Sequence, residues 1–306
     1  MRSPVTDPMT RDERRAGASL AAIFGLRMFG LFMILPVFSV YAPTLAGGDD
    51  ALLVGFALGA YGLTQAFFQI PYGIASDRWG RKPVIVAGLL LFAAGGFLAA
   101  TADHIGWVIA GRVIQGAGAI SAAVTALAAD LTREQHRTKV MAMIGATIGL
   151  VFALSLVAAP VLYAAIGMPG IFALTGALAL AAIILLLKAV PSPPAVAAPR
   201  RVPFATVLWH PQLARLNFGV LALHMMQTAL WVVVPPLLVA VGGLAVTEHW
   251  KIYLPAVLLS FVAMVPAIIL AEKRGRMKMV FVGAVSLLTL VQAGFAMLSG
   301  GLYSVG

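Results

Sequence analysis

The sequence contains no cysteine and few charged residues, and both absences exclude classes of protein. Without a cysteine in its 306 residues, the chain has no disulfide scaffold, thiolate metal site or cysteine nucleophile. Only 10% of the residues are charged and 61% are hydrophobic, whereas soluble domains have about 25% charged and 45–50% apolar residues. A soluble fold of this length could not bury so much apolar side chain, so the composition predicts a membrane protein.

The arrangements that carry enzyme or metal chemistry are also missing from the sequence. Its five histidines are scattered and no carboxylate cluster accompanies them, so no metal site is predicted. No nucleophile–base pair and no phosphate-binding loop is visible. The net charge of +10 does not indicate nucleic acid, because a Lys/Arg excess in a membrane protein marks its cytoplasmic loops. We therefore expect neither an enzyme, nor a cofactor, nor a nucleic-acid partner.

Nine apolar runs are each long enough to cross a ~30 Å hydrocarbon layer as a helix. The runs cover residues 18–42, 51–76, 83–101, 107–129, 140–166, 170–187, 213–241, 252–271 and 279–299. They are continuously apolar and lack the alternation that the strands of a membrane barrel need. The sequence therefore predicts an all-α, multi-pass protein of the lipid bilayer.

Basic residues gather in alternate connections between these runs and predict the orientation of the chain. Of the 21 Lys and Arg residues, Lys251 alone lies in the opposite set of connections, and Arg27 and Arg112 lie inside spans. The others are Arg2, Arg11, Arg14, Arg15, Arg78, Arg81, Lys82, Arg133, Arg137, Lys139, Lys188, Arg200, Arg201, Arg215, Lys273, Arg274, Arg276 and Lys278. Basic loops stay on the cytoplasmic side, so the N-terminus is predicted to be cytoplasmic in a bacterial-type inner membrane.

A proline-rich stretch divides the chain into two groups of spans. Five prolines between residues 189 and 203 predict an extended linker. The predicted organisation is a cytoplasmic tail (1–17), a six-helix bundle (18–188), a cytoplasmic linker (189–212) and a partial bundle of three helices (213–306). Residues 77–81 resemble residues 272–276, which indicates that the second and eighth spans are equivalent helices of two repeated halves.

Two motifs carry a family resemblance. After the second span stands G-x-x-x-D-R-x-G-R-K, and within the fourth span stands R-x-x-Q-G-x-G. Their defining residues are Gly73, Asp77, Arg78, Gly80, Arg81 and Lys82 in the first, and Arg112, Gln115, Gly116 and Gly118 in the second. The first resembles the signature loop of the major facilitator superfamily, and the second that of its proton-linked members. Over residues 12–300 the chain resembles the YajR-type branch of drug:proton antiporters.

The resemblance implies a fold and an activity. Members have twelve spans, so the expectation is a major facilitator fold truncated after the ninth. It also implies a secondary active transporter that exports a small molecule in exchange for protons by alternating access, with the proton gradient as its energy source. The alternative is a non-transporting fragment, inert or acting by helix association. Neither the substrate nor the oligomeric state is readable from the sequence.

The signature loop is expected to form a cytoplasmic latch. The resemblance implies that Asp77 caps the eleventh helix of complete members and that Arg81 pairs with Asp130 at the end of the fourth span. Gly73, Arg78, Gly80 and Lys82 complete this set. The alternative is a solvated turn that only obeys the charge rule for cytoplasmic loops.

Proton coupling has three candidate locations. The resemblance assigns it to Arg112, which lies roughly 8 Å into the fourth span, together with Gln115 and Gly116. The alternative is that Arg112 snorkels outward to the membrane surface. Arginine cannot release its proton in the physiological range, so the candidate proton carriers are His224, because histidine has an unperturbed pKa of about 6.5, and Asp130 at the cytoplasmic end. A lone membrane histidine is more often structural.

Polar faces on two spans and one central charge on a third are the candidates for the substrate cavity. Tyr61, Gln65 and Gln69 share one face of the second span, and Thr228 and Trp231 share a face of the seventh. No Asp or Glu lies in the middle of any span, and the central charge is Arg27, roughly 14 Å into the ~30 Å core. A fixed cation there predicts rejection of organic cations and attraction of anions or polar neutral molecules. The alternatives are interhelical hydrogen bonding for the polar faces and a packing contact with a helix carbonyl for the arginine.

Overall fold

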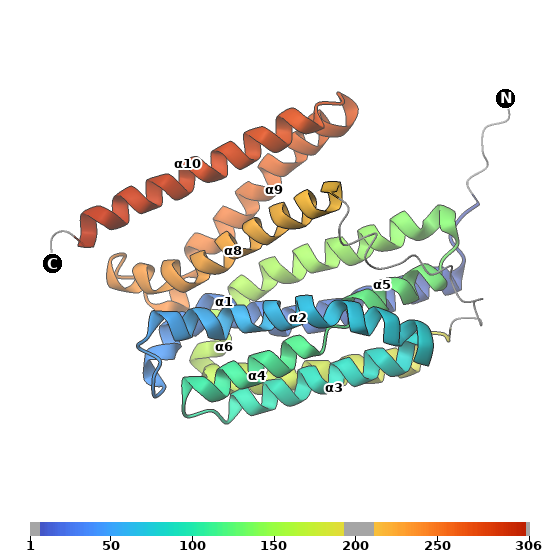
Figure 1. Ribbon diagram of the computed structural model, residues 1–306, viewed down its shortest axis with the longest axis horizontal. Helices are drawn as coiled ribbons and strands as arrows, with labels where there is room; N and C mark the ends of the chain where they lie inside the picture. The colour runs from blue at the N-terminus through green and yellow to red at the C-terminus, as the bar shows by residue number, and fades with distance from the viewer. Residues whose placement is uncertain (1–6, 193–210, 304–306) are drawn as a thin grey trace. The chain divides into compact units, whose positions relative to one another are not determined.

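The computed structural model describes residues 7–192 and 211–303, and within these residues the chain is helical and contains no strand (Figure 1). The expected tail and linker lie partly outside the described residues. The long helices are α1 (Arg11–Tyr41), α2 (Ala51–Trp79), α3 (Arg81–Ala100), α4 (Ile105–Ala117), α5 (Ser121–Asp130), α6 (Glu134–Ala189), α8 (Pro211–Ala240), α9 (Trp250–Lys273) and α10 (Met277–Tyr303). Short 3-10 turns occupy Ala42–Thr44 and Val246–Glu248. The all-α prediction is confirmed.

Eight helical segments of the described residues are long and apolar enough to cross a membrane, whereas nine spans were predicted. The difference lies in α6, whose 56 residues would extend about 84 Å if straight, far more than a bilayer core. Gly167 interrupts it with φ 66° and ψ −179°, a left-handed backbone that favours glycine. The two arms, 134–166 and 168–189, correspond to the predicted fifth and sixth spans.

The predicted fourth span is not continuous. Helix α4 ends at Ala117, and α5 begins only at Ser121. The break packs against α3 so closely that a Cβ on Gly118 would lie 2.3 Å from the carbonyl oxygen of Gly88. Small residues permit such backbone contact between membrane helices. The break lies about 20 Å from the start of α4, well inside the span.

Two compact units divide the chain, Met1–Lys251 and Ile252–Gly306. In the first unit α1 packs against α6, α2 and α3 pack against α4, and α8 contacts α1 and α2. Ser39 Oγ of α1 donates a 2.9 Å hydrogen bond to the carbonyl oxygen of Trp231 in α8. The second unit contains α10 and all but the first two residues of α9. The proposed division into six and three spans stays a prediction.

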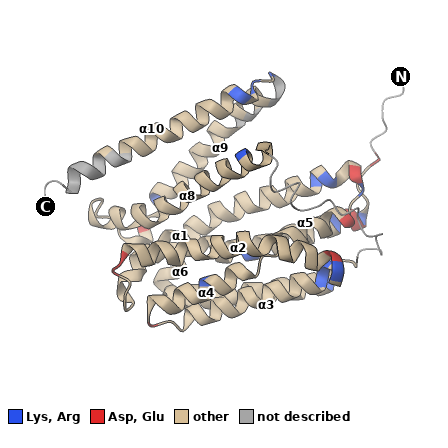
Figure 2. Ribbon diagram, in the orientation of Figure 1, with Lys and Arg blue, Asp and Glu red and all other residues tan. Residues whose placement is uncertain are grey.

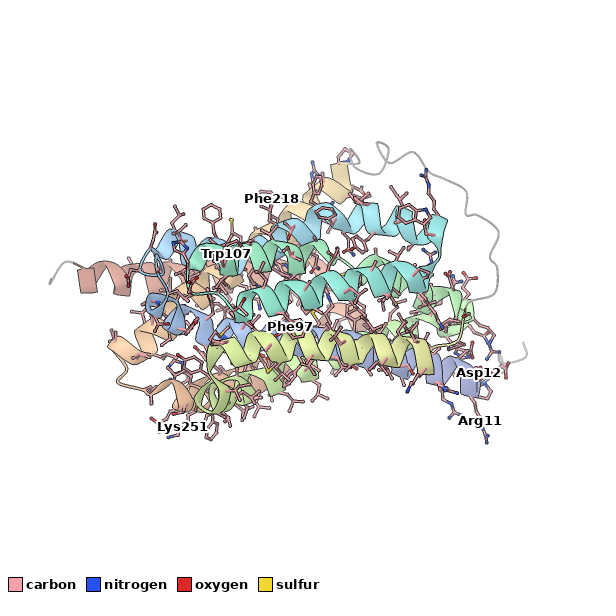
Figure 3. The ribbon with its side chains drawn as sticks, turned by 90° about the horizontal axis from the view of Figure 1, so that it is seen from below. Arg11, Asp12, Phe97, Trp107, Phe218 and Lys251 are labelled. Carbon is pink, nitrogen blue, oxygen red and sulfur yellow. The ribbon has the colours of Figure 1, made fainter. Side chains whose placement is uncertain are left out.

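Apolar side chains cover the outer surface of the first unit. Phe97, Trp107 and Phe218, labelled in Figure 3, are 41%, 56% and 70% exposed. Arg11 and Lys251 lie at opposite ends of the unit. Charged residues gather at the helix ends, as at the turn between α2 and α3 (Figure 2). An apolar belt between charged ends suits a bilayer.

The orientation of the chain can be tested with reporter fusions. Fusions after Lys82 and Lys139 are expected to place fluorescent protein in the cytoplasm, and a fusion after Asp103 is expected to give active alkaline phosphatase, because the basic connections stay inside. Measuring both reporters at each site provides its own control. Phosphatase activity after Lys82 would contradict the predicted orientation.

Candidate functional site

The signature loop begins where α2 ends. Gly80 separates α2 from α3 with φ 93°, a value that glycine adopts without strain, and this turn places Arg81 at the start of α3. Arg81 Nε donates a 2.8 Å hydrogen bond to Asp130 Oδ2 at the end of α5, so the expected contact is present. Arg81 Nη1 also pairs with Asp77 and donates to Ser76 Oγ at 2.7 Å. The Arg81 and Asp130 side chains are only 15% and 20% exposed.

The other members of the signature loop have separate places. Lys82 Nζ donates to the carbonyl oxygen of Val190, just after α6. Arg78 is exposed. A Cβ on Gly73 would make an ordinary 3.8 Å contact with Ala122 of α5. The loop thus connects α2 and α3 with α5 and the end of α6.

The latch contact can be tested with a double-mutant cycle. Because the pair is partly shielded from water, the Arg81→Ala and Asp130→Ala changes should couple by about 1 kcal/mol in detergent stability. Asp130→Ala should cost less than Arg81→Ala, because Arg81 retains Asp77 as a partner. The matched control combines Arg81→Ala with Asp50→Ala. Asp50 lies at the other end of α2, so the two losses of stability should be additive. Additive effects for the first pair would show that the contact contributes nothing.

A second ion-pair cluster, which sequence reasoning missed, lies near the latch. Arg133, between α5 and α6, donates from Nε to Glu13 Oε1 and from Nη2 to Glu13 Oε2, both at 2.9 Å. Its backbone N–H donates to the same carboxylate at 3.0 Å, and Asp7 also pairs with it. The hydrogen bonds with Glu13 and Asp7 raise the pKa of Arg133. Glu13 also closes a capping box with Thr10 at the start of α1. The T-x-x-E spacing is the sequence signal that could have drawn attention to Glu13.

Arg112 points into the bundle and does not snorkel. It is 1% exposed, and its Nη1 donates a 3.0 Å hydrogen bond to Gln115 Oε1. Its Nε donates to the carbonyl oxygen of Ala57 in α2 at 3.2 Å. Its guanidinium carbon lies 4.9 Å from the centre of the Tyr61 ring, within range of a cation–π interaction.

Gly116 lets α4 approach α2 at the same level. A Cβ on Gly116 would lie 1.9 Å from Thr64 Oγ1 and 2.3 Å from the carbonyl oxygen of Tyr61. No real side chain tolerates these distances, so the site requires glycine. The backbone contact brings the Tyr61 ring next to Arg112.

Arg27 is fully buried and is held by α2, α3 and the break after α4. Its Nη2 donates to Gln65 Oε1 at 3.2 Å and to the carbonyl oxygen of Gly118 at 3.3 Å. The guanidinium carbon lies 5.0 Å from the centre of the Phe92 ring and 5.7 Å from that of Tyr61. The structure therefore contains the helix-carbonyl contact that was the packing alternative, and the arginine itself is 0% exposed.

The polar face of α2 borders this cluster. Tyr61 is 7% exposed, whereas Gln65 and Gln69 are half-buried. Tyr61 Oη and Gln69 Oε1 are buried and have no hydrogen-bond partner within the described residues. Arg27, Tyr61, Gln65, Arg112 and Gln115 thus form one cluster from α1, α2 and α4, which we call the arginine cluster.

The α8 residues predicted for the site, His224, Thr228 and Trp231, are not part of the arginine cluster. His224 is exposed, and its Nδ1 lies 2.9 Å from the carbonyl oxygen of Val220, one turn earlier. Thr228 Oγ1 likewise donates to the carbonyl oxygen of His224. Trp231 is half-buried and packs edge to face on Phe152 of α6, with ring centres 6.4 Å apart.

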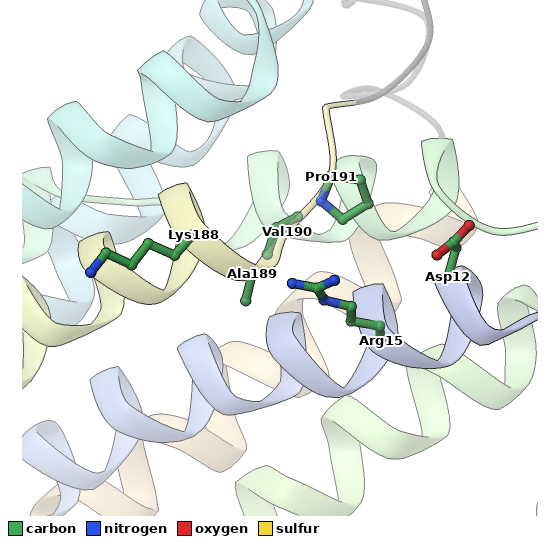
Figure 4. Close-up of a pocket in the computed structure, with 6 residues that line it drawn as sticks. All are labelled: Asp12, Arg15, Lys188, Ala189, Val190 and Pro191. Carbon is green, nitrogen blue, oxygen red and sulfur yellow. The ribbon is translucent and has the colours of Figure 1, made fainter.

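A cavity of about 240 Å³ lies at the end of the first unit where α1 begins and α6 ends (Figure 4). Its lining consists of Asp12, Arg15, Lys188, Ala189, Val190 and Pro191. The Arg15 guanidinium points toward Ala189 and Val190, whereas the Lys188 amine points away from it. The two cations do not converge, so the geometry gives no anion site there.

Comparison with known proteins gives the same family as the signature loop. The sequence model of the Major Facilitator Superfamily matches residues 20–306. Inner membrane transport protein YajR of Escherichia coli is 46% identical over 289 residues, which cover 93% of this chain and 63% of YajR. Multidrug resistance protein MdtH of Yersinia enterocolitica is 36% identical over 133 residues, 40% of this chain and 33% of MdtH. The chain thus spans less than two thirds of the length of these relatives.

Solved structures share the fold. A crystal structure of a bacterial homologue of the human lysosomal transporter Spinster, inward-facing and occupied, matches with a TM-score of 0.70. The match covers 87% of this chain and 63% of the other at 17% identity. At this identity the comparison shows the fold alone.

Proposed function

Because the chain belongs to the major facilitator superfamily of membrane transporters, and is therefore not an enzyme, we propose that it exports a small molecule in exchange for protons by alternating access. The observation that carries the proposal is the buried Arg112, bonded to Gln115 and to the backbone of α2 and stacked on Tyr61. A charge at this depth is costly, and such groups mark ion and substrate pathways in membrane proteins.

Three further observations support the proposal. MdtH, similar over 40% of this chain, is named as a multidrug resistance protein, which favours export. The break between α4 and α5 gives the fourth span the discontinuous form that transporters use at binding sites. The Arg81–Asp130 latch joins α3 to α5, and we assign it the role of stabilising one of the two access states.

The cluster changes the assignment of the proton-coupling residues. Arg112 and Gln115 touch the arginine cluster directly, whereas His224 is exposed and bonded within its own helix. Asp130 is engaged by Arg81. We therefore give Arg112 and its neighbours an electrostatic role in coupling. Because arginine does not release its proton in the physiological range, His224 and Asp130 stay the candidate proton carriers.

Proton exchange by the purified chain tests the proposal. The chain is reconstituted into liposomes with trapped pyranine, a pH gradient is imposed, and ring compounds of fixed charge are added: benzenesulfonate as the anion and benzyltrimethylammonium as the cation. A transported compound should accelerate collapse of the gradient in these liposomes and not in protein-free ones. If neither compound has an effect while the chain remains folded, proton exchange of this class of compound is excluded.

Association through exposed helices is the second candidate. In α8 only Pro235 is buried among the described residues, and the apolar windows of α9 and α10 are 0% buried. Such faces can bind other membrane helices. A purified chain that is uniformly oligomeric and inactive in the pyranine assay would favour this candidate.

A further inference from the structure

The buried charge of Arg27 has no carboxylate partner. The ion pairs formed by the described residues do not include Arg27, and its two hydrogen-bond acceptors, Gln65 Oε1 and the carbonyl oxygen of Gly118, are neutral. Its Nε and Nη1 donate to nothing in the described part of the chain, although both are buried. A buried charge is stable only when it is paired or fully hydrogen-bonded.

The neighbours of Arg27 compensate its charge only in part. The rings of Phe92 and Tyr61 offer cation–π contacts, and the C-terminal end of α4 at Gly118 attracts a cation. The ring faces, the Gln65 amide oxygen and the Gly118 carbonyl oxygen still leave the three N–H donors of Nε and Nη1 without acceptors. The cost is therefore not offset within the protein, which points to an acceptor that comes from outside.

Arg112 increases the demand for a negative charge. Its guanidinium contacts the same Tyr61 ring, and its Nη2 is also buried without an acceptor in the described residues. Two arginines on one ring, with no carboxylate in either set of hydrogen bonds, give this part of the bundle a positive potential. In a low dielectric such a potential attracts an anion and repels a cation.

Gln65 provides a route to the buried guanidinium. Arg27 is 0% exposed, but Gln65, which covers its Nη2, is half-buried and lies on the polar face of α2. Rotation of the Gln65 amide away from Nη2 would give an entering group access to Arg27. One turn further along α2, Gln69 Oε1 is a buried acceptor without a donor and can bind an N–H or O–H group of the same ligand.

We propose that Arg27, with Gln65 as its displaceable cover, binds the carboxylate of a small organic anion. The inference rests on the proposed function, because it names the class of compound that the transporter would carry. A carboxylate supplies acceptors to the free N–H groups of Arg27 and neutralises one of the two buried cations. An organic cation at this position would meet like charge instead.

The test compares three ligands with one ring and three charges: benzoate, benzamide and benzylammonium. Thermal unfolding of the purified full chain in detergent reports binding, because a ligand of the folded state raises the unfolding temperature. Benzoate should raise it in a saturable way, and the other two should not. Arg27→Gln should weaken apparent benzoate affinity by about tenfold or more, whereas the charge-matched control Arg15→Gln should leave it unchanged.

Two further variants keep the test decisive if Arg27→Gln does not fold. Arg27→Lys keeps the charge and should retain benzoate selectivity with weaker affinity. Gln65→Ala removes the cover and should tighten benzoate binding. Three results would each overturn the proposal. Arg27→Gln could bind benzoate as well as the native chain does, the native chain could prefer benzylammonium, or benzoate could leave the unfolding temperature of the native chain unchanged.

The outcome is separable from that of the transport proposal. Selective benzoate binding without proton exchange supports the anion site and contradicts transport of such anions. Proton exchange with benzyltrimethylammonium, without benzoate binding, supports transport and overturns the anion site.

Discussion

Gly116→Ala is expected to lose about 3 kcal/mol or more of stability and to leave little folded protein. The added Cβ would lie 1.9 Å from Thr64 Oγ1 and 2.3 Å from the carbonyl oxygen of Tyr61. Thr64 can rotate, but the carbonyl belongs to the backbone of α2 and cannot move without separating α2 from α4. Thermal unfolding in detergent and the yield of monodisperse protein measure the effect.

Gly59→Ala is the matched control for that variant. Gly59 lies in α2, and a Cβ there would meet nothing within 4 Å. Because alanine favours helix over glycine by about 1 kcal/mol, the control should be as stable as the native chain or slightly more stable. Equal stability of both variants would show that α2 and α4 do not make the close contact.

Arg112→Met is expected to slow proton exchange strongly without unfolding the protein. Methionine is unbranched and fills most of the space, and replacing a buried charge by an apolar residue is often close to neutral for stability. The loss of exchange should be about 100-fold, which is equivalent to about 2.7 kcal/mol. The pyranine assay measures the rate, and thermal unfolding measures the stability.

Arg137→Met provides the control for charge removal. Arg137 is exposed near the start of α6 and donates to backbone carbonyls, so its loss should leave the exchange rate within about twofold of native, because it stands outside the buried cluster. Exchange at a rate like that of the native chain in Arg112→Met would contradict the role of the arginine cluster in coupling.

Continuous apolarity predicted the helices because each span must bury its backbone hydrogen bonds within itself. It also separated the two arms of α6, since Gly167 and Pro169 interrupt the run there. The break at Gly118 was not predicted. The run R-V-I-Q-G-A-G-A contains no proline. At the break Gly118 lies against Gly88 and its carbonyl oxygen accepts from Arg27, contacts that the neighbouring residues in the sequence do not reveal.

Pairings over long sequence distances were the least predictable part of the site. Arg81 and Asp130 were paired by resemblance, and spacing alone would not have joined them. Glu13 and Arg133 are 120 residues apart, and the T-x-x-E spacing around Glu13 indicates a helix cap alone and not its distant partner. His224 was selected for its chemistry, but its exposed position in α8 depends on packing that a single sequence does not encode locally.

The central claim is that proton movement and compound movement are coupled through this chain, and running the exchange in reverse tests it most directly. Liposomes containing the chain are loaded with labelled benzenesulfonate at equal pH inside and outside, with the membrane potential clamped by potassium and valinomycin. As the compound leaves, pyranine should report acidification of the interior, in proportion to the label released. Release of label without any change in internal pH would contradict the account.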